Sequence, residues 1–253
     1  MPRFKITVAY DGTGLVGWQR QAAGTSVQGL LEESFAQLDG EAVEVAGAGR
    51  TDAGVHALGQ VAHVSLKRSI DAATLIAAVN VRLPPAVRVL GAEKVDPAFH
   101  ARFDSSRKFY RYRIWNGPVL SPFERLYAWH VPEPALDADA MDAAARLLEG
   151  EHDFAAFQTV GATTQTTRRR VFRSTVTRAE PPLIVYEVSG DGFLRHMVRS
   201  IVGTLVEVGR GRRPPSWVSE VVKSGERREA GRTAPAEGLF LVRVEYLAPA
   251  RQD

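Results

Sequence analysis

Two stretches with the alternating apolar pattern of β-strands flank a long glycine-rich loop, and this arrangement constrains the fold most. Val43-Glu44-Val45-Ala46 precedes the loop and residues 60–66 follow it, and such alternation is typical of half-buried strands. The loop is far longer than the two residues that can join antiparallel strands. A loop held between strands that carries Arg50 and Asp52 is a typical place for chemistry, although a wide hairpin in which the two merely pair has the same pattern. Glycines, which permit positive φ or close approach to a ligand, recur in it at positions 47, 49, 54 and 59.

Helices and strands alternate along the first half in the order of a ferredoxin-like fold. Strands are predicted at 5–10, near 43–48, at 60–66 and from 87, and helices, capped by Ser26 and Asp71, at 26–38 and 71–83. This is the order β-α-β-β-α-β.

The second half is predicted to repeat that order. Strands are expected at 109–115, 171–177, 183–188 and 239–246, and helices at 137–148, 194–208 and, as an addition, 216–223. The boundary is predicted near 104–106, which gives halves 1–104 and 105–253, and because no flexible linker is evident there the two sheets could be continuous. The predicted class is therefore α/β (α+β), with two ferredoxin-like halves, a central and mostly antiparallel sheet, and a basic cleft between the halves. The Thr-rich stretch Gln158–Thr167 is expected to be a mobile loop.

The cations of this chain are mainly arginine, which accounts for 27 of the 32 Lys and Arg residues. Arginine binds phosphate through two parallel hydrogen bonds and stacks on bases, although the codon bias of a GC-rich genome would have the same effect. Clusters at 107–113, 168–173 and 210–213 are typical of a protein that binds a polyanion.

Several classes of site are not expected. The chain has no cysteine, so disulfides and thiolate metal sites are excluded, and its histidines lack the spacing of metal ligands. No apolar run approaches the roughly 18 residues of a membrane span, and the N-terminus lacks the apolar region of a signal peptide. We therefore expect a cytoplasmic protein without a metal or membrane contact.

The loop sequence Gly49-Arg-Thr-Asp-Ala-Gly-Val-His56, followed by Gly59-Gln60-Val61, resembles the signature of the bacterial tRNA pseudouridine synthase A family. Further blocks resemble the same family in the same order, and with the signature they cover nearly the whole chain: Tyr10-Asp11-Gly12 with Gly17-Trp18-Gln19-Arg20, Phe99–Phe103 and Phe193–Arg199. The resemblance implies isomerisation of uridine to pseudouridine at positions 38, 39 and 40 in the anticodon stem-loop of tRNA. It also implies a homodimer that needs no cofactor.

The resemblance assigns catalytic roles to three residues. Asp52 is implied to be the nucleophile, because the reaction must break a glycosidic bond and needs an ionised carboxylate; attack at the sugar C1′ and at the pyrimidine C6 are both open. Tyr110 matches an active-site tyrosine that could stack on the uracil, although its place on one face of a strand equally fits core packing. Arg199 matches the cation that the family pairs with its aspartate. Arg195 is expected on the same helix face as Arg199, where a solvated basic face is the alternative.

Further residues are implied to contact the RNA. Arg50 is expected to fill the space that an extruded base leaves in its stem. Other predicted contacts are Phe99, His100, Ala101, Arg102 and Phe103, which match the family's RNA-contacting segment, and the cluster Arg168, Arg169 and Arg170.

Two alternative functions have different chemistry. A non-catalytic RNA-binding or RNA-chaperone protein could use the same basic surface, but would not need Asp52, Tyr110 and Arg199. A nucleotide-dependent enzyme would have to use Gly47-Ala48-Gly49 as a phosphate loop. That alternative fails because no Gly-Lys-Ser/Thr follows and the next element is predicted to be a strand.

Overall fold

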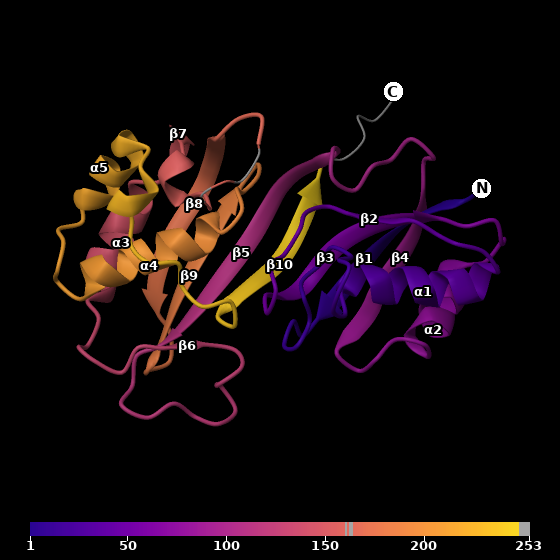
Figure 1. The fold of residues 1–253 in the computed structure, drawn as a ribbon, viewed down its shortest axis with the longest axis horizontal. Coiled ribbons are helices and arrows are strands. Elements are labelled where there is room, and N and C mark those ends of the chain that lie inside the picture. Colours follow the sequence, from indigo (N-terminus) through magenta and orange to yellow (C-terminus); the bar gives the residue numbers. More distant parts are fainter. Residues whose placement is uncertain (160, 162–163, 248–253) are drawn as a thin grey trace. The chain divides into compact units, whose positions relative to one another are not determined.

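A computed structural model describes residues 1–159, 161 and 164–247 (Figure 1). The chain divides into two compact units, one formed by Met1–Arg107 with the chain from Leu241 onward, the other by Lys108–Phe240. Both units combine helices with strands that pair mostly antiparallel, which confirms the predicted class. Residues 160, 162 and 163, within the predicted mobile loop, lie outside the described residues.

The first unit has the predicted βαββαβ order. Its elements are β1 (Arg3–Tyr10), α1 (Val27–Asp39), β2 (Val45–Gly47), β3 (His56–Ser65), α2 (Ala72–Asn80) and β4 (Val87–Val95). The strands lie in the order β4-β1-β3, with β2 also beside β3. Both predicted caps are present: the Ser26 side chain accepts from Gly29 N at 3.1 Å, and that of Asp71 from Thr74 N at 3.0 Å.

The core of the first unit follows directly from the alternation of β1. Every second residue of this strand is buried, starting with Phe4 and ending with Tyr10. Helix α1 contributes Val27, Leu31 and Phe35 to the buried set, whereas Leu30 is only half-buried. Tyr10 therefore ends a fully buried row at the point where the chain enters the loop before α1.

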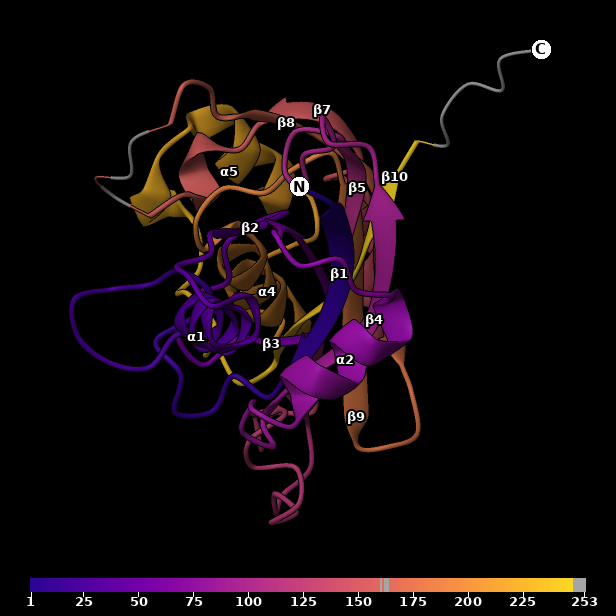
Figure 2. The same ribbon diagram turned by 90° about the vertical axis from the view of Figure 1, so that its right-hand side faces the viewer.

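The second unit repeats the order with additions. Its main elements are β5 (Ser105–Trp115), α3 (Ala138–Arg146), β8 (Arg168–Arg178), β9 (Leu183–Gly190), α4 (Met197–Gly209) and β10 (Leu239–Tyr246). Strand β5 pairs with β9, and β9 with β8. Helix α4 lies on one side of β5 and β9 (Figure 2), and α3 packs on β8 and α4.

The additions are short elements. The sequence analysis expected α5 (Trp217–Ser224), but not β6 (Trp129–His130), β7 (Gly150–Asp153) or the single 3₁₀ turns Ala155–Phe157 and Arg227–Glu229. Strand β7 pairs with the start of β8. None of the helices in the described residues is long and apolar enough to span a membrane.

Helix α4 begins later than predicted. It starts at Met197 rather than at Leu194. His196 has a left-handed backbone conformation with φ 63°, so an α-helix cannot pass through this residue. Arg195 therefore precedes the helix, and the prediction that it shares a helix face with Arg199 is wrong. The helix buries an apolar stripe made of Met197, Ile201, Leu205 and Val208.

Strands β5 and β10 both run through the boundary between the units. The divisions fall at Arg107/Lys108 and at Phe240/Leu241, whereas the sequence analysis placed a single boundary after residue 104. Hydrogen bonds join the two strands in both units. In the first unit, Ser106 Oγ donates to the Glu245 carbonyl oxygen at 3.1 Å. In the second unit, Arg113 N donates to the Gly238 carbonyl oxygen at 2.9 Å. Each strand thus contributes residues to both units, which explains the lack of a linker in the sequence.

Candidate active site

The backbone around Asp52 is fixed on both sides of that residue. The carbonyl oxygen of Thr51 accepts from Trp18 N at 3.0 Å, and the carbonyl oxygen of Asp52 accepts from Val55 N at 3.2 Å. Thr51 is buried and Asp52 is half-buried. The backbone position of Asp52, between β2 and β3, is therefore well defined. A side chain that must approach a reacting atom in one orientation requires such a fixed backbone.

The segment between β2 and β3, residues 48–55, is called the Asp52 loop below. The long loop between β1 and α1 packs directly on it. A Cβ atom at Gly17 would lie 2.5 Å from the Thr51 carbonyl oxygen, and one at Gly12 would lie 2.1 Å from that of Val55. Gly17 also has φ +103°, which favours glycine. These glycines permit contact between the two backbones, so the Asp11–Thr25 loop supports the candidate nucleophile.

Two buried side chains of neighbouring strands complete this support. The Tyr10 hydroxyl oxygen lies 2.8 Å from Thr51 Oγ1, and Gln60 Nε2 donates to the Gly49 carbonyl oxygen at 2.9 Å. Burial raises the pKa of Tyr10 to about 12, although hydrogen bonds with Thr51 and Gln60 oppose that shift. Arg50, between these anchored residues, is exposed, which suits the predicted contact with RNA.

The histidines near the loop have structural partners. His56 Nδ1 accepts from Gly12 N at 3.0 Å and lies 3.1 Å from Asp11 Oδ1. His63 Nδ1 accepts from Ala101 N at 3.1 Å, and burial lowers the pKa of His63 to about 4. In the described part of the chain, no three His, Asp or Glu side chains are grouped so as to hold a metal ion.

The predicted RNA-contacting segment 99–103 has two kinds of residue. Ala101 is fully buried, and its carbonyl oxygen accepts from the Tyr246 hydroxyl at 2.7 Å. Phe99 packs on the same tyrosine, with ring centroids 5.2 Å apart. Arg102 and Phe103 are exposed and His100 is half-buried beside Phe103, so these three residues are more accessible than the buried Ala101.

Tyr110 lies on the buried side of β5 in the second unit. It is 8% exposed, opposite Val188 in the register of β9, and its ring contacts Phe193 edge to face with centroids 5.0 Å apart. The predicted alternation of this strand is confirmed, because Tyr110, Tyr112 and Ile114 are buried and their neighbours along the strand are not. Tyr110 therefore packs in the core of the second unit against Phe193, and its stacking on a base stays a prediction.

Arg199 is fixed by a segment that the sequence analysis did not single out. Its Nε donates to the Ala234 carbonyl oxygen at 2.7 Å, and Ala234 N donates to the Arg199 carbonyl oxygen at 3.0 Å. A Cβ atom at Gly203 would lie 1.7 Å from the Arg232 carbonyl oxygen, so this glycine permits the segment to lie on α4. Glycine in a helix interior is unfavourable by itself, and Gly203 was the sequence signal for such a contact.

The three arginines at the start of β8 do not lie on one face of the strand. Val171 pairs with Gly190 and is buried. Because residues two apart in a strand share a face, Arg169 lies on the same face of β8 as Val171. Arg168 and Arg170 are exposed on the opposite face. Lys108 pairs with the same Gly190 and lies two residues from Tyr110, so Val171 and Tyr110 lie on the same face of the sheet. Of the three arginines, only Arg169 shares that face. The three arginines are therefore divided between two faces of β8, and their contact with RNA stays a prediction.

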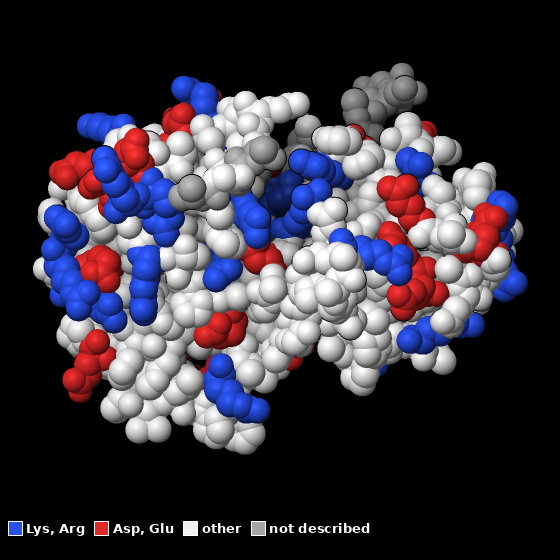
Figure 3. Space-filling model, viewed as in Figure 1, with Lys and Arg blue, Asp and Glu red and all other residues white. Residues whose placement is uncertain are grey.

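Acidic residues are interspersed among the arginines of the second unit (Figure 3). Glu207 pairs with Arg210 at 3.1 Å and with Arg212 at 3.0 Å. Arg168 pairs with Glu151 at 3.1 Å and Arg111 with Glu187 at 2.8 Å. The arginine clusters thus have a smaller net positive charge than their sequence indicates, and their contribution to RNA binding depends on the individual residue.

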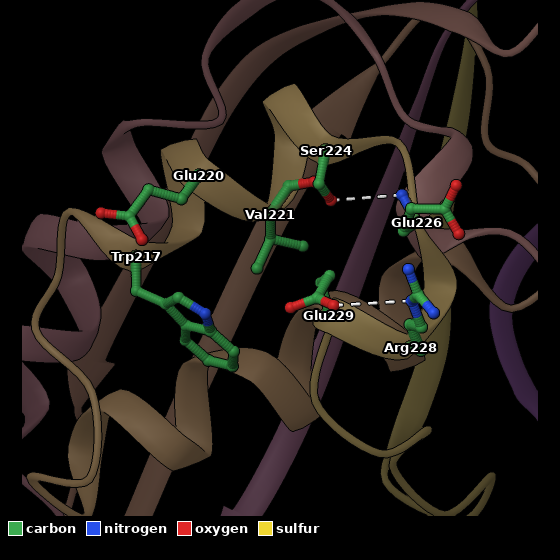
Figure 4. A pocket seen from close by; sticks show the side chains of 7 residues that line it. All are labelled: Trp217, Glu220, Val221, Ser224, Glu226, Arg228 and Glu229. Carbon is green, nitrogen blue, oxygen red and sulfur yellow. Dashed lines mark hydrogen bonds and ion pairs between the residues drawn. The ribbon is translucent and has the colours of Figure 1, made fainter.

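A hollow of about 320 Å³ lies beside α5 in the second unit (Figure 4). Its lining includes Trp217 and Val221 but is mainly polar and contains three glutamates and one arginine. None of the predicted site residues lines it, and its excess of carboxylates does not suit RNA. We assign no function to this hollow.

The residues predicted to act together are divided between the units. Asp52, Arg50 and the segment 99–103 belong to the first unit, and Tyr110, Arg199 and the β8 arginines to the second. The sequence analysis identified these residues but not the supporting contacts of Tyr10, Phe193 and Ala234.

Comparisons with known proteins identify the family. A family model described as tRNA pseudouridine synthase matches residues 6–104 and 144–247. The protein named tRNA pseudouridine synthase A of Pelobacter propionicus is 46% identical over 97% of this chain and 100% of its own. Proteins of the same name from Syntrophotalea carbinolica and Solibacter usitatus are 47% and 48% identical, over 96% and 97% of this chain and 95% and 100% of their own. The chain therefore belongs to the tRNA pseudouridine synthase family, whose members are isomerases.

Proposed function

We propose that this protein converts uridine to pseudouridine at positions 38, 39 and 40 in the anticodon stem-loop of tRNA, with Asp52 as the nucleophile. The observation that carries the proposal is the Asp52 loop: its backbone is anchored at Gly49, Thr51 and Asp52, as set out above. A carboxylate carried by an anchored backbone, in a loop that matches the family signature, is suited to attack on a bound uridine. Substrate and product contain the same atoms, so the reaction needs no second substrate.

The other predicted residues have supporting roles in this proposal. Tyr110 stacks on the extruded uracil, and Arg199 is the cation that keeps the nucleophile ionised. Arg50, which is exposed beside the anchored peptides, occupies the space left by the base, since an enzyme that works on a paired base must extrude it. The protein acts in the cytoplasm as a homodimer that binds the anticodon arm.

The proposal is tested by mapping pseudouridine in an unmodified tRNA transcript after incubation with protein, using carbodiimide-blocked reverse transcription. Wild-type protein should place pseudouridine at 38, 39 or 40. Asp52→Ala and Asp52→Asn should abolish turnover and leave tRNA affinity near wild type, because affinity rests on phosphate contacts. Asp139→Ala, which removes an exposed carboxylate on α3, is the control and should retain full activity.

Two outcomes would contradict the proposal. If Asp52→Ala forms pseudouridine at more than a few per cent of the wild-type rate, Asp52 is not the nucleophile. If wild-type protein binds the transcript but forms no pseudouridine in any tRNA, the protein is a non-catalytic RNA-binding member of the family.

A further inference from the structure

Tyr10 lies next to the proposed nucleophile in the fold but has no role in the reaction as proposed above. Its side chain is 4% exposed at the end of β1, and its hydroxyl oxygen lies 2.8 Å from the hydroxyl oxygen of Thr51. Thr51 is itself 7% exposed. The hydrogen bond therefore forms between two buried hydroxyl groups, and removal of either leaves the other without this partner.

Thr51 is the residue directly before Asp52, and its backbone is also fixed. Trp18 N donates to the Thr51 carbonyl oxygen at 3.0 Å, in the peptide group that Thr51 shares with Asp52. The Gly49 carbonyl oxygen is held at 2.9 Å by Gln60 Nε2. Residue 51 thus has anchors on both its backbone and its side chain, and the side-chain anchor is the Tyr10 hydroxyl.

We propose that Tyr10 is a positioning residue for Asp52: through the Thr51 hydroxyl it fixes the direction in which the Asp52 carboxylate leaves the loop. The inference rests on the proposed role of Asp52 as nucleophile. A nucleophile must approach its target within a narrow range of distance and angle, and a misplacement of about 1 Å can lower a rate roughly 100-fold. Tyr10 itself does not touch the substrate.

The hydrogen bond should be insensitive to pH over the working range of the enzyme. Burial raises the pKa of Tyr10 to about 12, so its hydroxyl keeps the proton at pH 6 to 9. Loss of the hydroxyl should therefore lower the rate by the same factor at every pH in that range. A general acid or base at this position would instead change the shape of the pH–rate profile.

The experiment measures single-turnover pseudouridine formation and tRNA affinity in hydroxyl-deletion variants. Tyr10→Phe and Thr51→Val keep the size of each side chain but remove the hydrogen bond. Each should lower the single-turnover rate constant roughly 10-fold or more, while the Kd for tRNA stays within about twofold of wild type. Thr51→Ser, which keeps the hydroxyl, should restore most of the rate.

A matched control separates positioning from stability. Tyr186 is also fully buried, and its hydroxyl oxygen lies 3.0 Å from the hydroxyl oxygen of Ser174 in the second unit. Tyr186→Phe therefore makes the same chemical change in the second unit, at a residue with no hydrogen bond to the Asp52 loop. It should lower the thermal midpoint about as much as Tyr10→Phe does and leave the single-turnover rate unchanged.

The double variant and Asp52→Ala distinguish the possible failures. If Tyr10 acts through Thr51, the double variant Tyr10→Phe/Thr51→Val should be no slower than the slower single variant. A wild-type rate in folded Tyr10→Phe, or a rate loss equal to that of Tyr186→Phe, would overturn the positioning role while Asp52→Ala stays inactive. An active Asp52→Ala would overturn the nucleophile assignment instead.

Discussion

Gly17 and Gly14 lie in the same loop and both have positive φ, yet only Gly17 contacts the Asp52 loop. Their φ angles are +103° and +75°, and nothing lies within 4 Å of a Cβ atom at Gly14. Gly14→Ala should therefore lower the free energy of unfolding only through its backbone conformation, by about 1–2 kcal/mol. In Gly17→Ala the new Cβ atom would also overlap with the Thr51 carbonyl oxygen. The free energy of unfolding should therefore fall by roughly 2–5 kcal/mol.

Urea unfolding of both variants checks this difference, and single-turnover rates show whether the displaced loop still supports the reaction. Equal stability losses would mean that the loop moves away from Thr51 without cost. The sequence analysis named Gly17 within a block that resembles the family but did not show what it contacts. Whether a glycine permits a turn or a backbone contact depends on residues far along the chain, here Thr51.

His63 should make the stability of the protein depend on pH. Its pKa is lowered to about 4, mainly by burial and also by the positive charges of His100 and Arg3, while Asp104 opposes the shift. An unfolded chain binds a proton at this residue near pH 6.5, whereas the folded chain does not. The contribution of neutral His63 to the free energy of unfolding is therefore complete above pH 6.5. It is lost as the pH falls toward 4, by up to about 3 kcal/mol.

Urea unfolding of wild type and His63→Asn between pH 7 and pH 4.5 measures this contribution. Asparagine can still accept the hydrogen bond from Ala101 N but has no proton to gain. The variant should therefore lose less stability than wild type as the pH falls. Identical pH dependence would show that His63 is protonated in the folded protein as well.

At the scale of secondary structure, the predictions were best where a cap or a regular alternation marks an element. Ser26, Asp71 and the row Tyr110, Tyr112, Ile114 are examples. Strands β6 and β7 were missed because two and four residues are too few to show a period. The start of α4 was wrong because His196 has a left-handed conformation that is uncommon for any residue other than glycine, so the sequence did not reveal it.

The alternation of β8 leads to a prediction about RNA binding. If tRNA lies on the face that carries Tyr110, Arg169 contributes to binding, whereas Arg168 and Arg170 on the opposite face do not. Arg169→Ala should then weaken tRNA binding and reduce the slope of log K against log salt by about one phosphate contact. The double variant Arg168→Ala/Arg170→Ala removes twice the charge and should leave the slope unchanged.

Filter binding of unmodified tRNA at several salt concentrations checks this prediction. Single-turnover rates at saturating protein provide the control, since a phosphate contact should affect binding more than chemistry. A larger loss of slope in the double variant would place the RNA on the other face of the strand.

At the scale of the whole molecule, the sequence showed two βαββαβ repeats but not how the chain is divided between them. It placed the boundary near residues 104–106, without a linker, and it assigned all of β5 and β10 to the second half. The structure divides both strands and returns the chain from Leu241 onward to the first unit. Periodicity identifies strands, but it does not show which core each end of a long strand joins.

Assembly is the remaining property at this scale. We proposed a homodimer because the resemblance to tRNA pseudouridine synthase A implies RNA contacts from both subunits. If each tRNA needs two subunits, a monomer offers only part of the phosphate-binding surface and should bind tRNA much more weakly. Activity per protomer should then fall when the protein is diluted below the dissociation constant of the dimer.

Sedimentation velocity at 0.1 to 20 µM, with single-turnover assays at the same concentrations, tests this prediction. The protein should sediment as a dimer at micromolar concentration, and the loss of rate on dilution should follow the loss of dimer. Excess tRNA should shift both transitions to lower protein concentration, because a ligand that binds the dimer stabilises it. Full activity per protomer in a monomeric sample would show that one subunit suffices, and the implied need for both subunits would be wrong.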